Sequence, residues 1–382
     1  MKSNLKCLIG PVLTHNTNCI ITVAPAEVLV NNFIIPYYNP SKDIGYQREP
    51  SKTRIKKLAK KLLERDADLP TLIVANIRNI DAQDHILKGE FKYNPDLHGK
   101  LFIADGQHRL MALKLAMDEA TENQDETNLK RLKEKLIPTL ISFTSNNELV
   151  EMSTFYSINR EAKNVPINDA AMIMHRRYKM GDEEIMEELD IKGETWRAVA
   201  GDVAKKLNHE CPVWGNRIKS PGQKIPAPNI TFAAMVNHLK PFVTSPDLEG
   251  RGINFITEVV SSYWCSIEAK HPGMFTQERA KTFAIQTSSA TEVINKIWDH
   301  VRAKIQNSAN LENKELNKKE CYLEIMGTLI ESCHGTNGLN DEVIGTDYWL
   351  KGKQGCAGMY TSNSAKSTFA TYLKGLLSDI NV

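Results

Sequence analysis

The sequence predicts an α/β (α+β) protein, with a mixed N-terminal domain over residues 1–170 and a mainly helical domain over residues 171–382. Two observations support this division. In the first part, short apolar or β-branched runs alternate with helical patterns, as expected where strands interleave with helices. In the second part, apolar residues recur mostly at three- and four-residue steps, which is typical of amphipathic helices.

The N-terminal domain yields a series of short strands and longer helices. The helix at 53–65 has a clear apolar face, because its apolar residues recur at steps of three, four, seven and eight. That face consists of Ile55, Leu58, Ala59, Leu62 and Leu63. Strands are expected at 19–25, 71–77, 101–104 and 137–143, and further helices from about 106 and over 147–160.

The C-terminal domain begins with three expected helices, over 170–180, 182–190 and 195–210. A proline- and glycine-rich loop follows at 211–230, and a long helical region then extends to about residue 330. We interpret residues 310–320 as a solvated face or linker, because Asn, Lys and Glu dominate them. Residues 355–368 contain Ala-Lys-Ser but lack the glycine frame of a phosphate-binding loop, so we expect an ordinary loop there.

The composition limits the classes of protein to which this chain can belong. The chain is 41% apolar and 25% charged with a net charge of +2, so any nucleic-acid surface must be a local patch. The seven cysteines form no CxxC pair, which favours reduced thiols in a cytoplasmic protein. We find no ligand-spaced metal cluster, no Walker motif, no signal-peptide core and no stretch as long as a membrane span.

Five polar or charged residues follow the strand at 101–104 directly: Asp105, Gly106, Gln107, His108 and Arg109. Asp105 stands where a helix N-cap would stand, and Gly106 permits a sharp turn. The first amides of the next helix lack intrahelical partners, and Arg109 adds a positive charge beside them. This combination predicts an anion site, most simply for phosphate. The alternative is a capped turn whose His108 and Arg109 are merely solvated.

A second cluster is basic. Between Arg48 and Arg65 there are eight basic and two acidic residues, a local net charge of 8 − 2 = +6. Arg54, Lys57 and Lys61 form a stripe opposite the apolar face of the 53–65 helix. Such a stripe suits DNA or RNA phosphates, although a solubilising surface gives the same pattern.

Three smaller groups of residues are further candidates for a functional site. Gln47 and Arg48 precede the basic helix and can line a cleft instead. Asn159 and Arg160 stand near the end of the 147–160 helix, where a cation also answers the helix dipole. Arg176 and Arg177, on the next helix, are added to the nucleic-acid-binding candidates.

The segment ADGQHRLMALKLA resembles the defining motif of the DGQHR-domain family, which includes the DndB proteins of DNA phosphorothioation systems and relatives from 7-deazaguanine DNA-modification clusters. Three further blocks resemble the family in the same order. They are GYQREPSKTRI, FYSINREAKNVP and VWGNRIKSPGQK. One departure concerns Ala162 to Pro166, where DndB proteins commonly carry an arginine-proline-serine run.

The resemblance implies a ParB/sulfiredoxin-like N-terminal domain whose strand–turn–helix cradles nucleotide phosphates, with ATP and Mg²⁺ as cofactors. It implies an ATPase that binds double-stranded DNA and works with other proteins of a bacterial DNA-modification cluster. A homo-oligomer is possible. Catalytic candidates are then Asp105, His108 and Arg109, with Asp105 a possible Mg²⁺ ligand. Nucleotide-binding candidates are Gly106, Gln107, Arg109, Gln47, Arg48, Asn159 and Arg160.

Two alternatives stand beside the ATPase. The first is a non-catalytic DNA-binding regulator of the modification operon, which the basic helix serves equally well. The second is a ParB-like DNA-nicking nuclease, which ranks last because the sequence offers no dense acidic cluster for the required metal.

Overall fold

The computed structural model describes residues 3–14, 17–39, 42, 44–64, 69, 71–87, 89–145, 148–162, 166–276, 282–308 and 314–380. The chain divides into two compact units, Met1–Pro166 (unit 1) and Ile167–Val382 (unit 2).

Unit 1 is built on a mixed sheet of eight strands in the order β3-β7-β4-β8-β2-β1-β6-β5. Strands β3 and β7 are parallel, as are β4 and β8, and the remaining neighbours are antiparallel. The strands are β1 Ser3–Thr14, β2 Thr17–Pro25, β3 Phe33–Ile34, β4 Ile73–Ile77, β5 Ile86–Leu87, β6 Glu90–Tyr93, β7 Leu101–Asp105 and β8 Leu136–Phe143.

The burial of the central strands follows their sequences. All five residues of β4 are buried; four of them are apolar, and the fifth, Asn76, is hydrogen-bonded to Glu151. In β8 buried and less buried residues alternate, so one face of the strand packs on the core. Ile141 of β8 lies opposite Ala75 of β4 on one side and Ile20 of β2 on the other.

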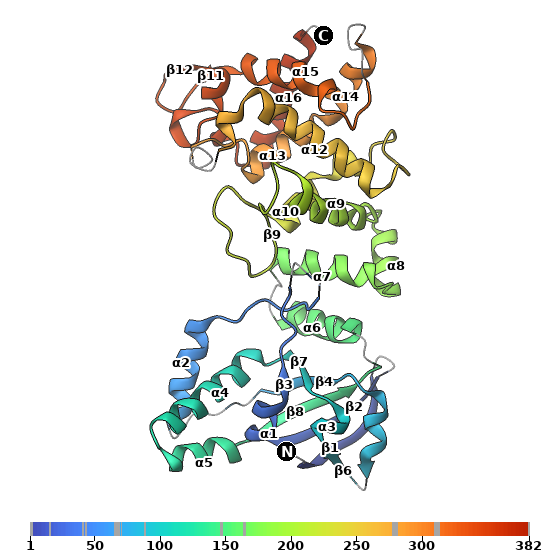
Figure 1. Ribbon diagram of the computed structural model, residues 1–382, viewed down its shortest axis with the longest axis vertical. Coiled ribbons are helices and arrows are strands. Elements are labelled where there is room, and N and C mark those ends of the chain that lie inside the picture. The colour runs from blue at the N-terminus through green and yellow to red at the C-terminus, as the bar shows by residue number, and fades with distance from the viewer. Residues whose placement is uncertain are drawn as a thin grey trace. The chain divides into compact units, whose positions relative to one another are not determined.

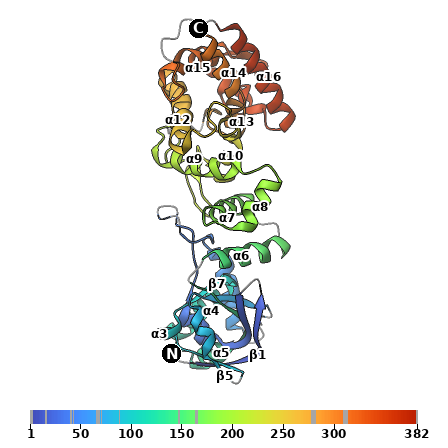
Figure 2. The ribbon, with the colours of Figure 1, turned by 90° about the vertical axis from the view of Figure 1, so that its right-hand side faces the viewer.

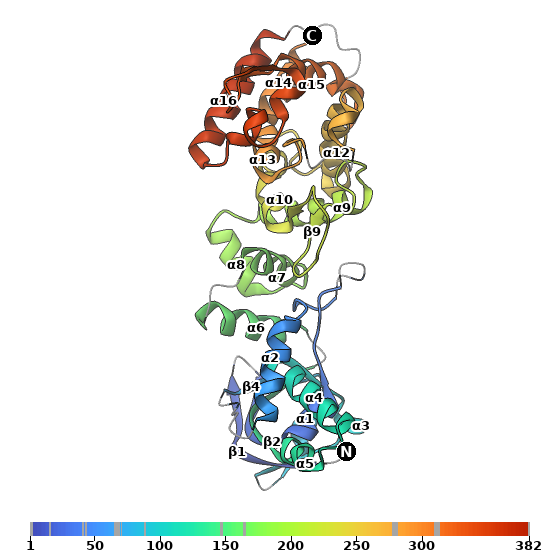
Figure 3. The same ribbon diagram turned by 90° about the vertical axis from the view of Figure 1, so that its left-hand side faces the viewer.

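Helices cover the sheet of unit 1. In Figures 1 and 3, α2, α4 and α5 gather on one side of the sheet, and α2 packs on α4. Their buried faces join the strands in one apolar core. The helices are α1 Ala26–Asn32, α2 Lys52–Leu63, α3 Pro95–His98, α4 Gln107–Glu122, α5 Glu126–Glu134 and α6 Glu148–Ala162, with a 3-10 turn η1 at Ile80–His85.

Unit 2 is mainly helical, and the predicted fold class is therefore confirmed for both parts of the chain. Figure 2 shows α7 and α8 as one pair and α12 to α16 packed together. The helices are α7 Ile167–Lys179, α8 Glu183–Ile191, α9 Trp196–Glu210, α10 Phe232–His238, α11 Lys240–Val243, α12 Gly252–Lys270, α13 Ser288–Lys296, α14 Trp298–Asn307, α15 Glu320–Ser332 and α16 Asn363–Asp379.

Short elements connect these helices. They are the parallel pair β9 Ile218–Lys219 and β10 Ile230–Thr231, the antiparallel pair β11 His334–Thr336 and β12 Glu342–Ile344, and the 3-10 turns η2 Pro272–Met274, η3 Gly345–Trp349, η4 Gly352–Gln354 and η5 Ala357–Met359. The core is aromatic, and Tyr263 contacts Trp264, Trp298 and Tyr322 edge to face.

One expected loop is wrong in part. The sequence predicts an irregular segment over 355–368, but α16 begins at Asn363. The helix starts there because the Ser362 hydroxyl accepts a hydrogen bond from the amide of Ala365 at 3.2 Å, which is an ordinary N-cap. The serine, rather than a glycine frame, is the local signal in this segment.

Two further findings concern the chain as a whole. No helix within the described ranges is long and apolar enough to cross a membrane. None of the seven cysteines, all of which lie in the described ranges, forms a disulfide bond, and five of them are buried.

Candidate functional site

Strand β7 ends at Asp105, and α4 begins immediately after Gly106. Gly106 has φ +102°, a left-handed conformation that side-chain-bearing residues rarely adopt. A Cβ at this position would also lie 2.3 Å from the Ile73 Cδ1 atom. The expected N-cap role of Asp105 is wrong, because Gly106 occupies the cap position and no side chain caps α4.

The Asp105 carboxylate instead pairs with Arg109. The Arg109 guanidinium donates to Asp105 Oδ2 at 2.7 Å and to the Thr71 carbonyl at 2.5 Å, and it contacts the Thr71 hydroxyl. Its side chain is only 15% exposed, and burial lowers the pKa of Arg109 although Asp105 opposes this shift. Arg109 therefore ties the end of β7 to the segment before β4. Because Asp105 pairs with Arg109, the positive charge that was expected to bind a phosphate is largely neutralised.

His108 joins the starts of two helices. The Ser51 amide donates to His108 Nε2 at 3.1 Å, and Ser51 is itself the N-cap residue of α2. Burial lowers the pKa of His108, and the positive charges of Arg54 and Arg48 lower it further, against a smaller opposing effect of Asp105. An imidazole that accepts a hydrogen bond at Nε2 is neutral, which agrees with a lowered pKa.

The segment before α2 is held against β7 by Gln47. This side chain is 1% exposed, and its Nε2 donates to the Ala104 carbonyl at 3.4 Å and also to the Ile103 carbonyl. Gln47 was expected to face a nucleotide, but its amide nitrogen is used inside the fold. The neighbouring Arg48 is exposed, and Gln107 is half-buried.

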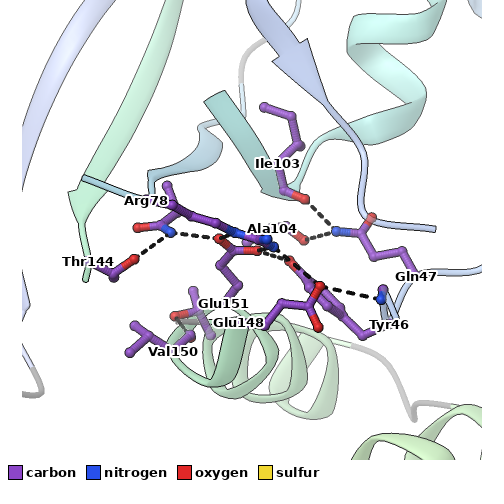
Figure 4. Close-up of polar contacts among 12 residues, drawn as sticks. Tyr46, Gln47, Arg78, Ile103, Ala104, Thr144, Glu148, Val150 and Glu151 are labelled. Carbon is purple, nitrogen blue, oxygen red and sulfur yellow. Dashed lines mark hydrogen bonds and ion pairs between the residues drawn. The ribbon is translucent and has the colours of Figure 1, made fainter. Parts of the chain in front are cut away.

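A buried polar cluster on α6 fixes the same segment from its other side. Glu151 is 1% exposed and accepts from Arg78 Nε and Nη2, each at 2.8 Å, and from Asn76 Nδ2 at 2.6 Å (Figure 4). The Tyr46 hydroxyl donates to Glu151 at 3.3 Å, and the Gly45 amide donates to Glu148 at 3.3 Å. We call Tyr46, Asn76, Arg78, Glu148 and Glu151 the Glu151 cluster.

The Glu151 cluster is a positioning device for the segment that carries Arg48. Burial alone lowers the pKa of Arg78, but the hydrogen bonds and charge of Glu151 outweigh this effect and raise it. The guanidinium also stacks on the Phe102 ring, 3.8 Å from its centroid. Sequence reasoning missed the cluster. The one available signal was an acidic side chain, Glu151, between the apolar residues Val150 and Met152.

Helix α2 presents an exposed basic face. Ile55, Ala59 and Leu62 are buried, and its six basic residues are all exposed. The helix contains no acidic residue, and within the described ranges none of the six forms an ion pair. We call these six residues the α2 surface: Lys52, Arg54, Lys56, Lys57, Lys60 and Lys61.

The remaining candidates lie elsewhere. Arg176 and Arg177 are 7% and 3% exposed, and Arg177 pairs with Asp182 at 2.5 Å and Glu184 at 2.7 Å. They are therefore not surface residues for nucleic acid, and the expected role is corrected. Both lie on the buried side of α7, and the two carboxylates compensate for the burial of Arg177. Asn159 and Arg160 lie on α6, but their side chains are outside the described residues.

The Asp105 carboxylate, the expected Mg²⁺ ligand, is engaged by Arg109. Within the described ranges, no group of three or more His, Cys, Asp or Glu residues lies close enough together to hold a metal ion.

The mixed α/β unit thus carries an exposed cationic helix whose N-cap residue, Ser51, contacts His108 of the DGQHR turn. Residues 12–168 match the family model of DndB, described as DNA-sulfur modification-associated. This match confirms the resemblance predicted from the motifs. It covers most of unit 1 and stops at the start of α7. No curated protein and no solved structure matches the chain.

Proposed function

We propose that unit 1 binds the phosphate backbone of DNA through the α2 surface, with Arg48 beside it, in the service of DNA-sulfur modification. A single observation carries this proposal, namely six exposed basic side chains on one helix with no acidic residue among them. Cations that no carboxylate neutralises are suited to replace the counterions of DNA. An ordinary solubilising helix mixes both signs of charge.

The position of the charges supports the proposal further. Lys52 and Arg54 lie in the first turn of α2, where the helix dipole is already positive and acidic residues are usual. This arrangement costs folding stability, because like charges meet, and a bound phosphate would relieve the repulsion. The lowered pKa of His108, partly due to Arg54 and Arg48, reports the same positive field.

The description of the matched family selects the biological context. It names DNA-sulfur modification, so we propose the phosphorothioation pathway rather than 7-deazaguanine insertion. The partners are then double-stranded DNA and other proteins of the modification cluster. Binding through phosphates is sequence-independent, so it positions the protein on DNA without specifying a target sequence.

The experiment compares the parent with the triple variant Arg54→Ala, Lys57→Ala, Lys61→Ala, using a fluorescein-labelled DNA duplex at several salt concentrations. Affinity should fall for all sequences alike, and the slope of log K against log salt should shrink by about 0.9 for each phosphate that the variant no longer neutralises. The fold should persist, because all three side chains are exposed.

A matched control changes Lys92, Lys114 and Lys130 to Ala. These lysines are equally exposed in unit 1 but lie on β6, α4 and α5, so the net charge falls by the same amount. The control should bind DNA nearly as the parent does. An equal loss of affinity in both triple variants would reduce the effect to net charge and remove the α2 surface as a site.

Nucleotide binding at the DGQHR turn is the second candidate, and one observation favours it. The N-termini of α2 and α4 both lack acidic residues in their first turns, and the Ser51–His108 hydrogen bond holds them together. Two positive helix ends side by side are suited to a polyphosphate such as ATP. Titration with ATP and a phosphate-release assay test this candidate. No heat of binding and no phosphate release would leave DNA binding alone.

A further inference from the structure

Unit 2 contains a cavity of about 730 Å³ where the proline- and glycine-rich loop follows α9. The loop runs beside β9 in Figures 1 and 3. Among the residues around the cavity are the cations Arg217 and Lys224 and the amides Asn208 and Gln223. None of the lining residues is acidic, and three of them are prolines.

Both amide side chains present hydrogen-bond donors to their surroundings. Asn208 Oδ1 accepts from the Ile218 amide at 2.8 Å, and Gln223 Oε1 accepts from the Ser220 amide at 2.9 Å. A backbone N–H can only donate, so the side-chain atom facing it must be the oxygen. The NH₂ groups of Asn208 and Gln223 are then the parts that remain for a ligand.

Arg217 is held in place by a buried amide. Its Nη1 donates to Gln286 Oε1 at 3.2 Å. Gln286 is 2% exposed, and its Nε2 donates to the Val213 carbonyl at 2.8 Å, which fixes the orientation of the amide. Within the described ranges no carboxylate lies at ion-pair distance from Arg217, and burial lowers the pKa of its guanidinium. A half-buried cation of this kind lacks the anion that would normally compensate for its burial.

The sequence explains why no carboxylate is near. From Cys211 to Pro246 the chain contains four Lys and Arg residues and no Asp or Glu. Elsewhere in unit 2 cations are commonly paired, as Lys206 is with Glu210 at 2.8 Å and Lys192 with Glu188 at 2.5 Å. The loop therefore keeps an uncompensated positive charge around a cavity lined by donors.

We propose that this cavity binds a phosphate-bearing ligand of nucleotide size, as a free nucleotide or as one nucleotide of a DNA strand. The Arg217 guanidinium, the Lys224 ammonium and the two amides supply the donors that phosphate oxygens require. Ile225 and the prolines supply apolar surface for a sugar or base. The volume lies within the range of roughly 300–1,000 Å³ that is usual for ligand pockets. The site is distinct from the α2 surface and does not depend on it.

The test uses the full chain with two probes, ATP in isothermal titration calorimetry and a fluorescein-labelled DNA strand in anisotropy. Lys224 is exposed and unpaired in the described part of the chain, so Lys224→Ala should leave the fold intact. Removal of one charge-assisted hydrogen bond should weaken binding about tenfold or more. Lys206→Ala removes the same charge from α9 outside the cavity and should change affinity less than twofold or so.

Arg217→Gln is the second variant and should weaken binding at least as much as Lys224→Ala does. Its melting temperature is measured as well, to show that the variant is folded. A loss for ATP alone identifies a free nucleotide as the ligand, a loss for DNA alone identifies a strand, and a loss for both identifies phosphate in either form. If Lys224→Ala binds both probes as tightly as Lys206→Ala does, or if the parent binds neither, the cavity is not a phosphate site. Failure of the α2 variants leaves this outcome unchanged.

Discussion

At the scale of single residues, the DGQHR turn holds several elements of unit 1 together. Gly106 allows the chain to leave β7 and start α4 without a further residue, and Arg109 and His108 fasten the turn to Thr71 and Ser51. Burial lowers the pKa of both His108 and Arg109, and the positive charge of Arg54 on the α2 surface lowers both further. The turn therefore positions the start of α2 relative to the sheet.

Gly106→Ala should destabilise unit 1 by roughly 2–4 kcal/mol, because it combines left-handed strain with a clash against Ile73. Gly99→Ala is the matched control, since Gly99 has φ +81° but open space around its Cβ position. The control should lose only about 1–2 kcal/mol. Urea unfolding measures both, and equal losses would contradict the role given to the close approach of Ile73.

Glu151→Gln should destabilise unit 1 by about 3 kcal/mol, near the lower end of the cost of breaking a buried ion pair. The change keeps the shape of the side chain but leaves the mostly buried Arg78 without its principal countercharge. Glu148→Gln removes a longer contact of 3.4 Å to the same guanidinium and should cost less than about 1 kcal/mol. A ranking in the opposite order in chemical denaturation would refute the central place of Glu151.

At the scale of elements, α2 shows what a sequence can specify. Its apolar period and its basic face were both predicted, because periodicity and charge are local properties of the chain. The strands β1, β3, β5 and β6 were not predicted. β1 contains Gly10 and Pro11 and lacks strict alternation, and β3 and β5 have only two residues each, so tertiary pairing decides their structure.

Helix α2 also offers a test of the conflict between folding and binding. Lys52→Glu places an acid in the first turn, where it should stabilise the helix by about 0.3–1 kcal/mol and weaken DNA binding at the same time. Lys61→Glu, in the last turn, should weaken DNA binding and lower stability as well. Thermal melts and DNA titrations of the two variants check the prediction. A loss of stability in Lys52→Glu would mean that the basic first turn is not costly.

At the scale of the whole molecule, unit 1 and unit 2 each have a core of their own, so we expect two unfolding transitions. The candidate site was only partly predictable. The motif marked the correct turn, but no sequence pattern shows that Arg109 pairs with Asp105 or that Gln47 turns inward. The Arg109–Asp105 pair is local, but the Thr71 and Ile103 partners of Arg109 and Gln47 lie far away in the chain. These longer contacts depend on how β7, β4 and the segment before α2 are assembled.

The transition of unit 2 should depend on pH through His238. Burial, assisted by Lys366 and Lys296 and opposed by Glu292, lowers the pKa of His238 from 6.5 to about 4. In the unfolded chain the imidazole takes up its proton near pH 6.5, so stability should fall as pH decreases from about 6.5 towards 4, by roughly 3 kcal/mol in total. In His238→Asn this part of the pH dependence should disappear. An equal melting temperature of unit 2 at pH 7 and pH 5 in the parent protein would disprove this role of His238.

Gln47 has one more consequence, which concerns association between chains. The outermost strands β3 and β5 have only two residues each, so β7 extends beyond the strand that should cover it. An exposed row of backbone carbonyls and amides is a template on which a strand of another molecule can form. The Gln47 amide occupies the Ile103 and Ala104 carbonyls at that place. At these two carbonyls, a single side chain therefore takes acceptors that the backbone of a further strand would otherwise use.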